Sequence, residues 1–330
     1  MESLFRKLSR LKVVVLGDVM LDTYWWGNVE RISPEAPVPV VALHKKEVRI
    51  GGAGNVALNT VALGAETFIV SFLGEDNDGN ELQQLFQQNK INTDYLLSSD
   101  NRITTNKTRI LSRNQQMMRL DGETTKDIST FKEENLLQKL NELFVKHQPD
   151  VLIFEDYNKG VLTKNLIVKV IGLCKKSNVI TTVDPKRKNF FAFQGVDIFK
   201  PNLKEVKDGL NLLIDDVNEN SLQQIHAALQ EKLHHQISFI TLSEKGVYFQ
   251  SPSEHKLIPT HVRSIADVSG AGDTAIATAS LVYAATKNML LAAEIANIAA
   301  GLVCEEVGTA AIDKEKLLHE CKVLLSEPRF

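Results

Sequence analysis

The stretch Asp267–Ala277 reads DVSGAGDTAIA and says most about the fold of this 330-residue chain. Gly270, Ala271 and Gly272 are small, so a ligand can approach their backbone closely, and Thr274–Ala285 is typical of a buried helix. The first turn of a helix presents unpaired N–H groups and a partial positive charge, which together bind phosphate. The stretch therefore predicts a phosphate site at the start of a helix.

Asp273 is the acidic residue of this stretch that stands at the predicted helix start. An Asp in this position commonly caps the helix or pairs with its dipole. A carboxylate beside an anion site is otherwise unfavourable, unless it accepts a proton from an attacking hydroxyl. Asp273 is therefore a candidate general base as well as a candidate cap.

Upstream of this stretch, short apolar runs alternate with amphipathic ones. The runs expected to be strands are 13–17, 67–73, 151–155, 179–183, 197–199 and 237–242. The runs expected to be helices are 55–63, 80–88, 131–147, 164–176 and 222–233. Such alternation indicates an α/β fold, with a parallel sheet covered by helices on both faces. Tyr24–Lys45 and Ile103–Leu120 are β-like without helices between them, which predicts a small β appendage.

Polar residues follow the ends of several predicted strands. These endings are Gly17-Asp18, Glu155-Asp156, Asp184-Pro185-Lys186, Lys200-Pro201-Asn202 and Thr241-Leu242-Ser243. In open parallel sheets, ligands bind beyond the carboxyl ends of the strands. One such ending only terminates a strand, whereas five of them would line one crevice.

Two further motifs have both a functional and a structural interpretation. Gly51–Asn55 (GGAGN) opens a helix and matches a dinucleotide fingerprint weakly, because it does not follow the first strand. Close backbone contact with a polar substrate, or a plain glycine-rich turn, suits it better. Asn202 and Glu205 have N-x-x-E spacing, which suits hydrated Mg²⁺ or simply a helix N-terminus. The P-loop pattern G-x-x-x-x-G-K-[ST] is absent from the sequence.

Basic residues gather in the second β-like region. Lys107, Arg109, Arg113 and Arg119 lie there, and the turn Ser112–Gln116 carries Arg, Asn and Gln. Such a turn suits a sugar phosphate, although a solvated hairpin has the same composition.

Composition restricts the class of protein. With 38 Lys+Arg against 41 Asp+Glu, the net charge of −3 argues against a dedicated nucleic-acid binder. The three cysteines form no CxxC pair, which fits a reducing compartment. No apolar run has the length of a signal peptide or a membrane span. We expect a cytoplasmic protein that does not bind membranes.

These motifs, in this order, resemble those of the ribokinase-like (PfkB) family of carbohydrate kinases over nearly the whole chain. Gly51–Ala57 resembles the first family signature, Asp267–Ala277 the second, and Lys200–Glu205 (KPNLKE) its N-x-x-E motif. Ser269 replaces the usual Thr, and Ser243 stands where many relatives have Gly. The resemblance implies a three-layer αβα sandwich, with residues 1–330 as one kinase domain and a β-sheet lid at about 24–43 and 103–120.

Within this family, four segments resemble the subgroup that phosphorylates D-glycero-β-D-manno-heptose 7-phosphate at C1. They are Gly17–Asp22 (GDVMLD), Arg31–Val40 (RISPEAPVPV), Leu111–Asp121 (LSRNQQMMRLD) and Asp184–Lys186 (DPK). The resemblance implies a heptose 1,7-bisphosphate product for ADP-heptose and the lipopolysaccharide core, made by a monofunctional kinase. Alternatives are a kinase of fructose 6-phosphate or ribose, a non-catalytic sugar-phosphate sensor and, remotely, a nicotinamide oxidoreductase.

The resemblance also implies roles for individual residues. Asp273 is the base, and the N–H groups of Gly270, Ala271 and Gly272 stabilise the transferring phosphoryl group. The residues expected around ATP are Asn202, Thr241, Ser243, Gly246, Gly272 and Asn297. The residues expected around the sugar phosphate are Asp18, Gly51, Gly52, Asn55, Arg113, Arg119, Asp156, Asp184 and Lys186. Asn202 and Glu205 hold Mg²⁺ through water, a monovalent cation such as K⁺ takes part, and the lid forms a homodimer.

Overall fold

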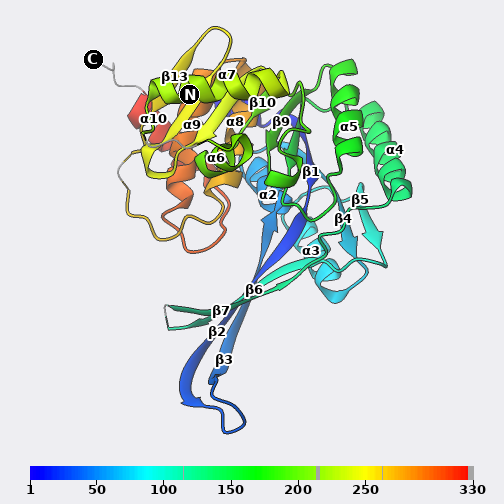
Figure 1. Cartoon of the computed structure of the whole chain (residues 1–330), viewed down its shortest axis with the longest axis vertical. Helices are drawn as coiled ribbons and strands as arrows, with labels where there is room; N and C mark the ends of the chain where they lie inside the picture. The colour runs from blue at the N-terminus through cyan, green and yellow to red at the C-terminus, as the bar shows by residue number, and fades with distance from the viewer. Residues whose placement is uncertain (114, 213–215, 262, 326–330) are drawn as a thin grey trace.

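A large sheet lies at the centre of the molecule (Figure 1). The computed structural model describes residues 1–113, 115–212, 216–261 and 263–325. Across the sheet, the strand order is β13-β12-β11-β10-β9-β8-β1-β4-β5. The strands are β1 (Lys12–Gly17), β4 (Glu66–Gly74), β5 (Leu96–Ser99), β8 (Val151–Glu155), β9 (Ile180–Asp184), β10 (Ile198–Phe199), β11 (Ile237–Thr241), β12 (Val247–Gln250) and β13 (His255–Ile258). From β5 to β11 neighbouring strands are parallel, and the unexpected β12–β13 hairpin adds an antiparallel edge.

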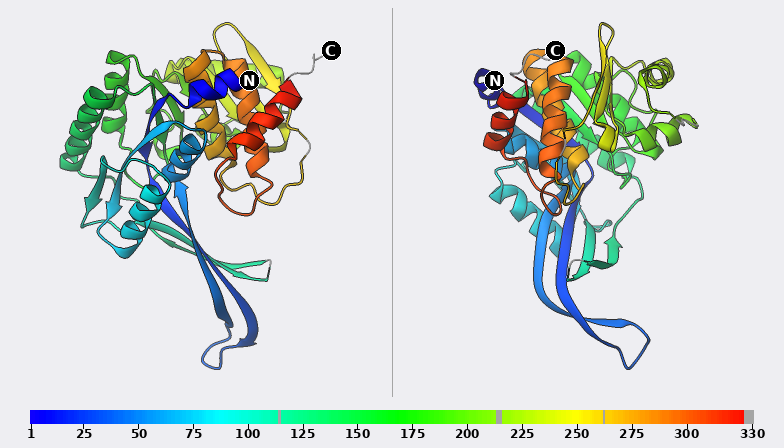
Figure 2. Two further views of the ribbon diagram at one scale, coloured as in Figure 1. Left: turned by 180° about the vertical axis from the view of Figure 1, so that it is seen from behind. Right: turned by 90° about the vertical axis from the view of Figure 1, so that its left-hand side faces the viewer.

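Helices cover both faces of this sheet (Figure 2). Along β1, Val13 and Val15 belong to one apolar core, and Val14 and Leu16 belong to the other. One face carries α1 (Glu2–Leu8), α2 (Ala53–Ala62), α3 (Asn77–Gln88), α8 (Ala271–Thr286), α9 (Met289–Val303) and α10 (Lys314–Leu325). The other carries α4 (Thr130–His147), α5 (Lys164–Lys176), α6 (Leu203–Leu210) and α7 (Glu219–Leu233). The helices on both faces confirm the predicted three-layer αβα sandwich. Burial of the strands on both faces also explains why their sequences are almost continuously apolar.

None of the helices within the described ranges has both the length and the apolar character that crossing a membrane requires.

A second sheet forms the lid, which projects from the body (Figures 1 and 2). Its strand order is β3-β2-β6-β7, with bounds Pro39–Gly52, Val19–Ile32, Thr105–Ser112 and Gln115–Gly122. The first two strands extend beyond the expected 24–43, because Val19–Tyr24 and Ile50–Gly52 are buried where the lid meets the body. Asn114, part of the turn expected to grip a phosphate, lies outside the described residues.

Gly52 stands where the lid strand β3 passes into α2. Its φ is 58°, and a Cβ placed there would lie 2.5 Å from the carbonyl oxygen of Asp18. The amide of Ala53 donates to the same oxygen at 3.0 Å. The start of β2 and the end of β3 therefore cross too closely for any residue other than glycine.

We predict that Gly52→Ala lowers the free energy of unfolding by roughly 1–3 kcal/mol, because alanine at positive φ is strained and clashes with backbone. Guanidinium unfolding followed by circular dichroism measures the change. Gly172→Ala is the matched control, because Gly172 lies in α5 and its added Cβ would meet nothing within 4 Å. Gly172→Ala should stabilise slightly by its helix propensity. Equal stability of the Gly52→Ala variant and the wild type would contradict the argument.

Candidate active site

The N-terminus of α8 is built to receive an anion. Gly270 is its N-cap with φ 81°, and the first helical bond runs from the amide of Thr274 to the carbonyl of Gly270 at 2.9 Å. The amides of Gly272 and Asp273 have no acceptor among the described residues. The amide of Ala271 donates to the carbonyl of Val268 at 3.3 Å, so it is partly engaged. The amide of Gly270 likewise has no acceptor among the described residues, so the free N–H groups at this end of α8 are those of Gly270, Gly272 and Asp273.

Asp273 is buried in the first turn of α8 and is held by two donors. The side-chain amide of Asn55 in α2 donates to one carboxylate oxygen at 2.7 Å, and the hydroxyl of Tyr157 donates to the other at 2.9 Å. Burial, helped by nearby Asp184, raises the pKa of Asp273 to about 6 against the lowering effect of the two hydrogen bonds. A carboxylate with a pKa near neutrality can accept a proton at physiological pH.

A charged cluster surrounds Asp184 at the end of β9. Lys186 and Lys200 contact its two oxygens at 3.1 and 2.8 Å, and Lys186 also contacts Glu205 at 2.7 Å. Burial alone would raise the pKa of Asp184, but the two ammonium groups hold it below its ordinary value. Burial alone would lower the pKa of Lys186, but Asp184 and Glu205 hold it above its ordinary value. The cluster therefore keeps its charges in a buried place.

Glu155, at the end of β8, lacks a partner in this cluster. It is fully buried, and neither carboxylate oxygen has a hydrogen-bond partner among the described residues. One of its oxygens lies within 4.8 Å of an oxygen of Asp184 and of an oxygen of Asp273. Burial, helped by these two carboxylates, holds the pKa of Glu155 well above its ordinary value. Such a group has oxygen ligands to offer, and carboxylate oxygens are what Mg²⁺ prefers.

Next to Asp273 and Gly272 lies a cavity of about 1110 Å³. It is large enough for a nucleotide. All the residues that we expect around ATP line it: Asn202, Thr241, Ser243, Gly246, Gly272 and Asn297. Asp184, Lys186, Gly270, Ala271 and Asp273 also line it. One cavity thus joins the N-terminus of α8, the candidate phosphate site, to the loops after β9, β10 and β11.

The N-x-x-E pair, Asn202 and Glu205, caps the N-terminus of α6. The side chain of Asn202 accepts from the amide of Glu205, and Glu205 accepts from the amide of Asn202, each at 2.8 Å, which is a capping box. The other oxygen of Glu205 accepts from Lys186. Contacts with Mg²⁺ would therefore add to a pair already bonded, whereas Glu155 is unpartnered.

Asp18 and Asp156 shape the loop that carries Tyr157. Asp18 accepts from the amides of Tyr157, Lys159 and Val161, each at 3.0 Å. Asp156 accepts from the amide of Asn158 at 2.8 Å, and burial raises its pKa to about 7. Both expected sugar ligands are thus engaged by backbone of this loop.

The other residues expected around the sugar are divided between the site and the lid. Asn55 and Lys186 belong to the site, and Gly51 and Gly52 lie at the root of the lid. Arg113 is exposed at the β6–β7 turn. Arg119 is exposed on β7 and pairs with Asp121 at 2.9 Å.

Sequence reasoning placed Glu155 and Lys200 among the strand endings that line one crevice, but it gave no individual role to Glu155, Tyr157 or Lys200. Glu155 and Tyr157 flank the Asp156 that was chosen, and Lys200 precedes the N-x-x-E pair. The position of the first two just after a predicted strand was a signal that could have identified them.

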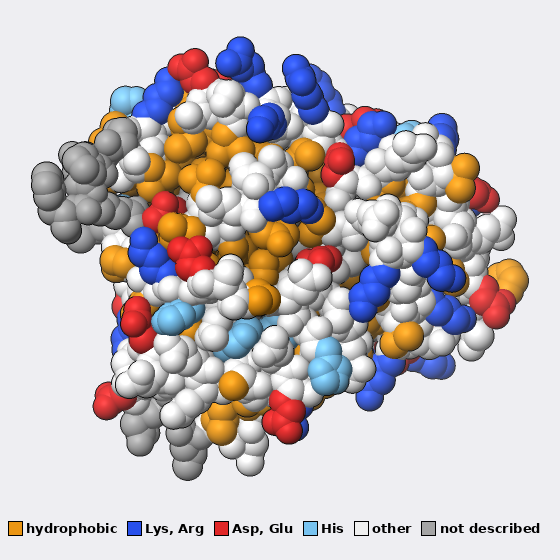
Figure 3. All heavy atoms as spheres, turned by 90° about the horizontal axis from the view of Figure 1, so that it is seen from above, with side chains coloured by type: hydrophobic (Ala, Val, Ile, Leu, Met, Phe, Trp, Pro, Cys, Tyr) orange, Lys and Arg blue, Asp and Glu red, His pale blue; other side chains and the backbone are white. Residues whose placement is uncertain are grey.

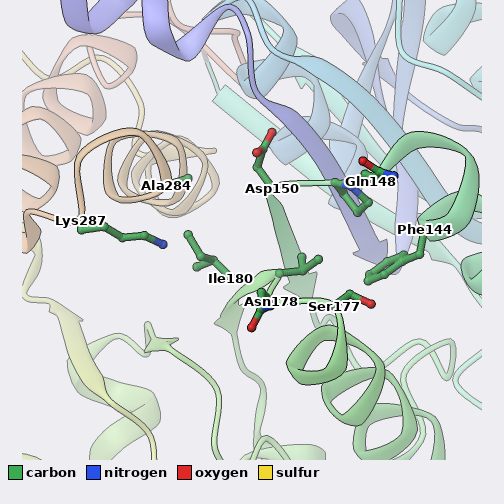
Figure 4. Close-up of a pocket in the computed structure, with 10 residues that line it drawn as sticks. Phe144, Gln148, Asp150, Ser177, Asn178, Ile180, Ala284 and Lys287 are labelled. Carbon is green, nitrogen blue, oxygen red and sulfur yellow. The ribbon is translucent and has the colours of Figure 1, made fainter.

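Another hollow lies at the opposite edge of the sheet, with a volume of about 560 Å³ (Figure 4). The hollow is lined by the carboxylate of Asp150, which accepts from the amide of Lys12 at 2.8 Å, and Lys287 reaches into the hollow from the end of α8.

Seen from the side away from the lid, apolar side chains gather in the middle of the surface, with Lys and Arg around them (Figure 3). The chemistry described above is concentrated at the other edge.

A family model described as pfkB family carbohydrate kinase matches residues 10–316 of this sequence. The chain belongs to the pfkB family of carbohydrate kinases. It is 38% identical over 301 residues to the bifunctional protein HldE of Sulfurimonas denitrificans, which is 91% of this chain and 62% of that protein. It is 41% identical over 306 residues to the HldE of Nitratiruptor sp., or 93% of this chain and 64% of that protein. The pfkB chain thus spans less than two thirds of the length of these relatives.

Solved structures show the same fold. Arabidopsis thaliana ribokinase complexed with ribose and ATP matches with a TM-score of 0.74 at 18% identity, over 94% of this chain and 98% of that one. Escherichia coli phosphofructokinase-2 in complex with potassium matches with a TM-score of 0.78 at 15% identity, over 96% and 99%. The pfkB chain therefore has the ribokinase-like fold.

We predict that Tyr157→Phe raises the pKa of Asp273 by about one unit. The hydroxyl of Tyr157 stabilises the ionised carboxylate, so its removal favours the protonated form. Titration of ¹³C-labelled Asp carboxyl groups by NMR, with Asp273→Asn to assign the signal, measures it. Tyr283→Phe is the control: Tyr283 lies on the same helix as Asp273, and its substitution should leave the pKa of Asp273 unchanged. An unaltered Asp273 titration in Tyr157→Phe would rule out this bond as a determinant of the pKa.

Proposed function

We propose that this chain transfers the γ-phosphate of ATP to the C1 hydroxyl of D-glycero-β-D-manno-heptose 7-phosphate. The product, heptose 1,7-bisphosphate, would lead to ADP-heptose and the lipopolysaccharide core. One observation carries the reaction type: Asp273, a buried carboxylate with a pKa of about 6, stands beside the free amides of α8 and a cavity of nucleotide size. Residues 1–330 would act as one kinase domain with its lid.

The proposed reaction follows from the position of Asp273. Its carboxylate would accept the proton of the C1 hydroxyl as that oxygen attacks the γ-phosphorus, and the bond from the γ-phosphorus to the β–γ bridging oxygen would break to release ADP. The amides of Gly272 and Asp273 would donate to the oxygens of the transferring group, where negative charge is concentrated. Lys186 and Lys200 would keep Asp184 ionised beside them. Phosphoryl transfer needs mainly positioning and charge stabilisation, and this arrangement offers both.

The donor set fits a magnesium ion, because Glu155 has two buried oxygens without partners next to Asp184. Glu155 and Asp184 would hold it, with Asn202 and Glu205 organising its waters. Bound with ATP, Mg²⁺ would neutralise charge on the phosphates. We include a monovalent cation such as K⁺ as an activator, since phosphofructokinase-2 of the same fold was solved in complex with potassium.

The heptose substrate is supported by resemblance. The GDVMLD, RISPEAPVPV and DPK segments resemble the heptose 7-phosphate subgroup, and the identity to HldE proteins extends over more than 90% of the chain. Fructose 6-phosphate and ribose remain the substrates to compare, because the fold alone is shared with ribokinase and phosphofructokinase-2.

We predict that Asp273→Asn lowers kcat by roughly 10²- to 10⁴-fold and leaves the Kd for ATP nearly unchanged, because only proton acceptance is lost. ADP release from Mg·ATP is measured with the heptose phosphate, fructose 6-phosphate and ribose, and ATP binding by calorimetry. Asp150→Asn, at the opposite edge of the sheet, is the control for the substitution itself. Near-normal turnover of Asp273→Asn would exclude Asp273 as the base. ATP binding without turnover of any sugar by the wild type would favour a sensor.

The outer face of the lid supports a homodimer. Met118 and Leu120 are 54% and 51% exposed on β7, next to Ile110 and Thr108 of β6 in the register. Alternate residues of a strand face opposite sides, so this apolar face lies opposite the one that carries Lys107 and Arg109. The lid of a second copy would cover it and protect its edge.

We predict that Met118→Lys combined with Leu120→Lys converts the dimer to a monomer, because ammonium groups cannot be buried in a paired lid. Sedimentation velocity at micromolar concentration measures this. Lys substitutions at Val145 and Val168, exposed on α4 and α5 away from the lid, are the control. A wild-type chain that sediments as a monomer would refute the dimer.

A further inference from the structure

Lys107 occupies an unusual position on the lid strand β6. Its side chain is half-buried, and its Nζ lies 5.1 Å from the ring centroid of Tyr157. Lys186, from the body, places its Nζ 5.3 Å from the same ring. The hydroxyl of that ring donates to Asp273. The lid thus brings a cation to within one tyrosine side chain of the candidate base.

The carboxylates beside Lys107 are already engaged. Asp22 of β2 and Asp121 of β7 stand opposite it in the sheet register. Asp22 pairs with Arg109 at 2.6 Å, and Asp121 pairs with Arg119 at 2.9 Å. Three cations therefore share two carboxylates, and the charge left over belongs to Lys107. Among the described residues, its ammonium has no hydrogen bond or ion pair.

The neighbouring cations, unlike Lys107, each have a hydrogen bond or an ion pair. Lys159 pairs with Glu123 at 2.5 Å, and Lys186 pairs with Asp184 and Glu205. Arg102 donates to the backbone carbonyl of Lys159. Burial lowers the pKa of Lys107, and Lys159 and Arg109 also lower it, against the raising effect of Asp22 and Asp121. A half-buried cation without a counterion favours the binding of an anion.

We propose that Lys107 binds the phosphate at the non-reacting end of the sugar phosphate, with the sugar lying along Tyr157 between this phosphate and Asp273. The assignment rests on the proposed function and deepens it, because it makes a phosphomonoester a requirement of the substrate. Arg113 and Arg119, expected from the sequence to bind this phosphate, are exposed, and Arg119 already has Asp121. A phosphate oxygen would also give the ammonium of Lys107 the charge-assisted hydrogen bond that it lacks.

The test is Lys107→Gln, which removes the charge and keeps much of the side chain. We expect its Kd for heptose 7-phosphate, measured by calorimetry without ATP, to rise roughly 10- to 100-fold, as for a lost charge-assisted hydrogen bond. In steady-state assays, KM for the sugar phosphate should rise while KM for ATP stays constant. Lys287→Gln is the matched control: Lys287 lies 5.5 Å from the ring of Tyr283, at the far end of α8. Inorganic phosphate is used as a second probe, through its effect on the melting temperature.

The outcomes separate this proposal from the proposed function. Loss of sugar-phosphate affinity in Lys107→Gln, with the affinity of Lys287→Gln unchanged, supports the assignment of Lys107. Unchanged affinity in that variant overturns it and leaves the kinase assignment standing. If the wild type releases no ADP with any sugar phosphate, but inorganic phosphate stabilises it and not Lys107→Gln, the anion site stands and the kinase assignment fails. A wild type that responds neither to sugar phosphates nor to inorganic phosphate overturns both.

Discussion

Three distant segments of the chain meet at the carboxylate of Asp273. Asn55 comes from α2, Tyr157 from the loop after β8, and Asp273 itself from α8. Each of the two donors takes one oxygen, so the side chain cannot rotate away without losing a buried hydrogen bond. The rest of the candidate site is arranged around this fixed point: the free amides of α8, the nucleotide-sized cavity beside them, and Lys107 of the lid near the ring of Tyr157.

Charge compensation explains how so many ionisable groups remain buried here. Lys186 and Lys200 neutralise Asp184 in part, and Lys186 also compensates Glu205. Glu155 has no such partner, and its pKa is held high by burial. Unpaired buried charge is costly, so burial favours the protonated form of Glu155, and a bound cation would favour its ionised form. The two carboxylate oxygens of Glu155 thus lack hydrogen-bond partners among the described residues, close to the candidate base Asp273.

The sequence indicated the fold well and the site in part. The strands β1, β4, β8, β9 and β11 and the glycine-rich start of α8 are local features with strong patterns, and they lie where expected. The roles of Asp18 and Asp156 are decided by which amides their carboxylates accept, and a sequence does not show hydrogen-bond partners. The position of Tyr157 and Glu155 at the end of β8 can be read from the sequence, but their contacts with Asp273 depend on how α8 packs against that strand. The state of Lys107 depends on cross-strand pairs in the lid, which need the register.

The lid joins the body through four covalent connections. β2 follows β1 after Asp18, β3 runs directly into α2, and β6 and β7 are joined to β5 and α4 by the chain on either side. A loop with two ends can swing as a flap, but a sheet held at four points can move only by bending. Any closure over a substrate would therefore store elastic strain along β2 and β3 and would tend to reverse on its own.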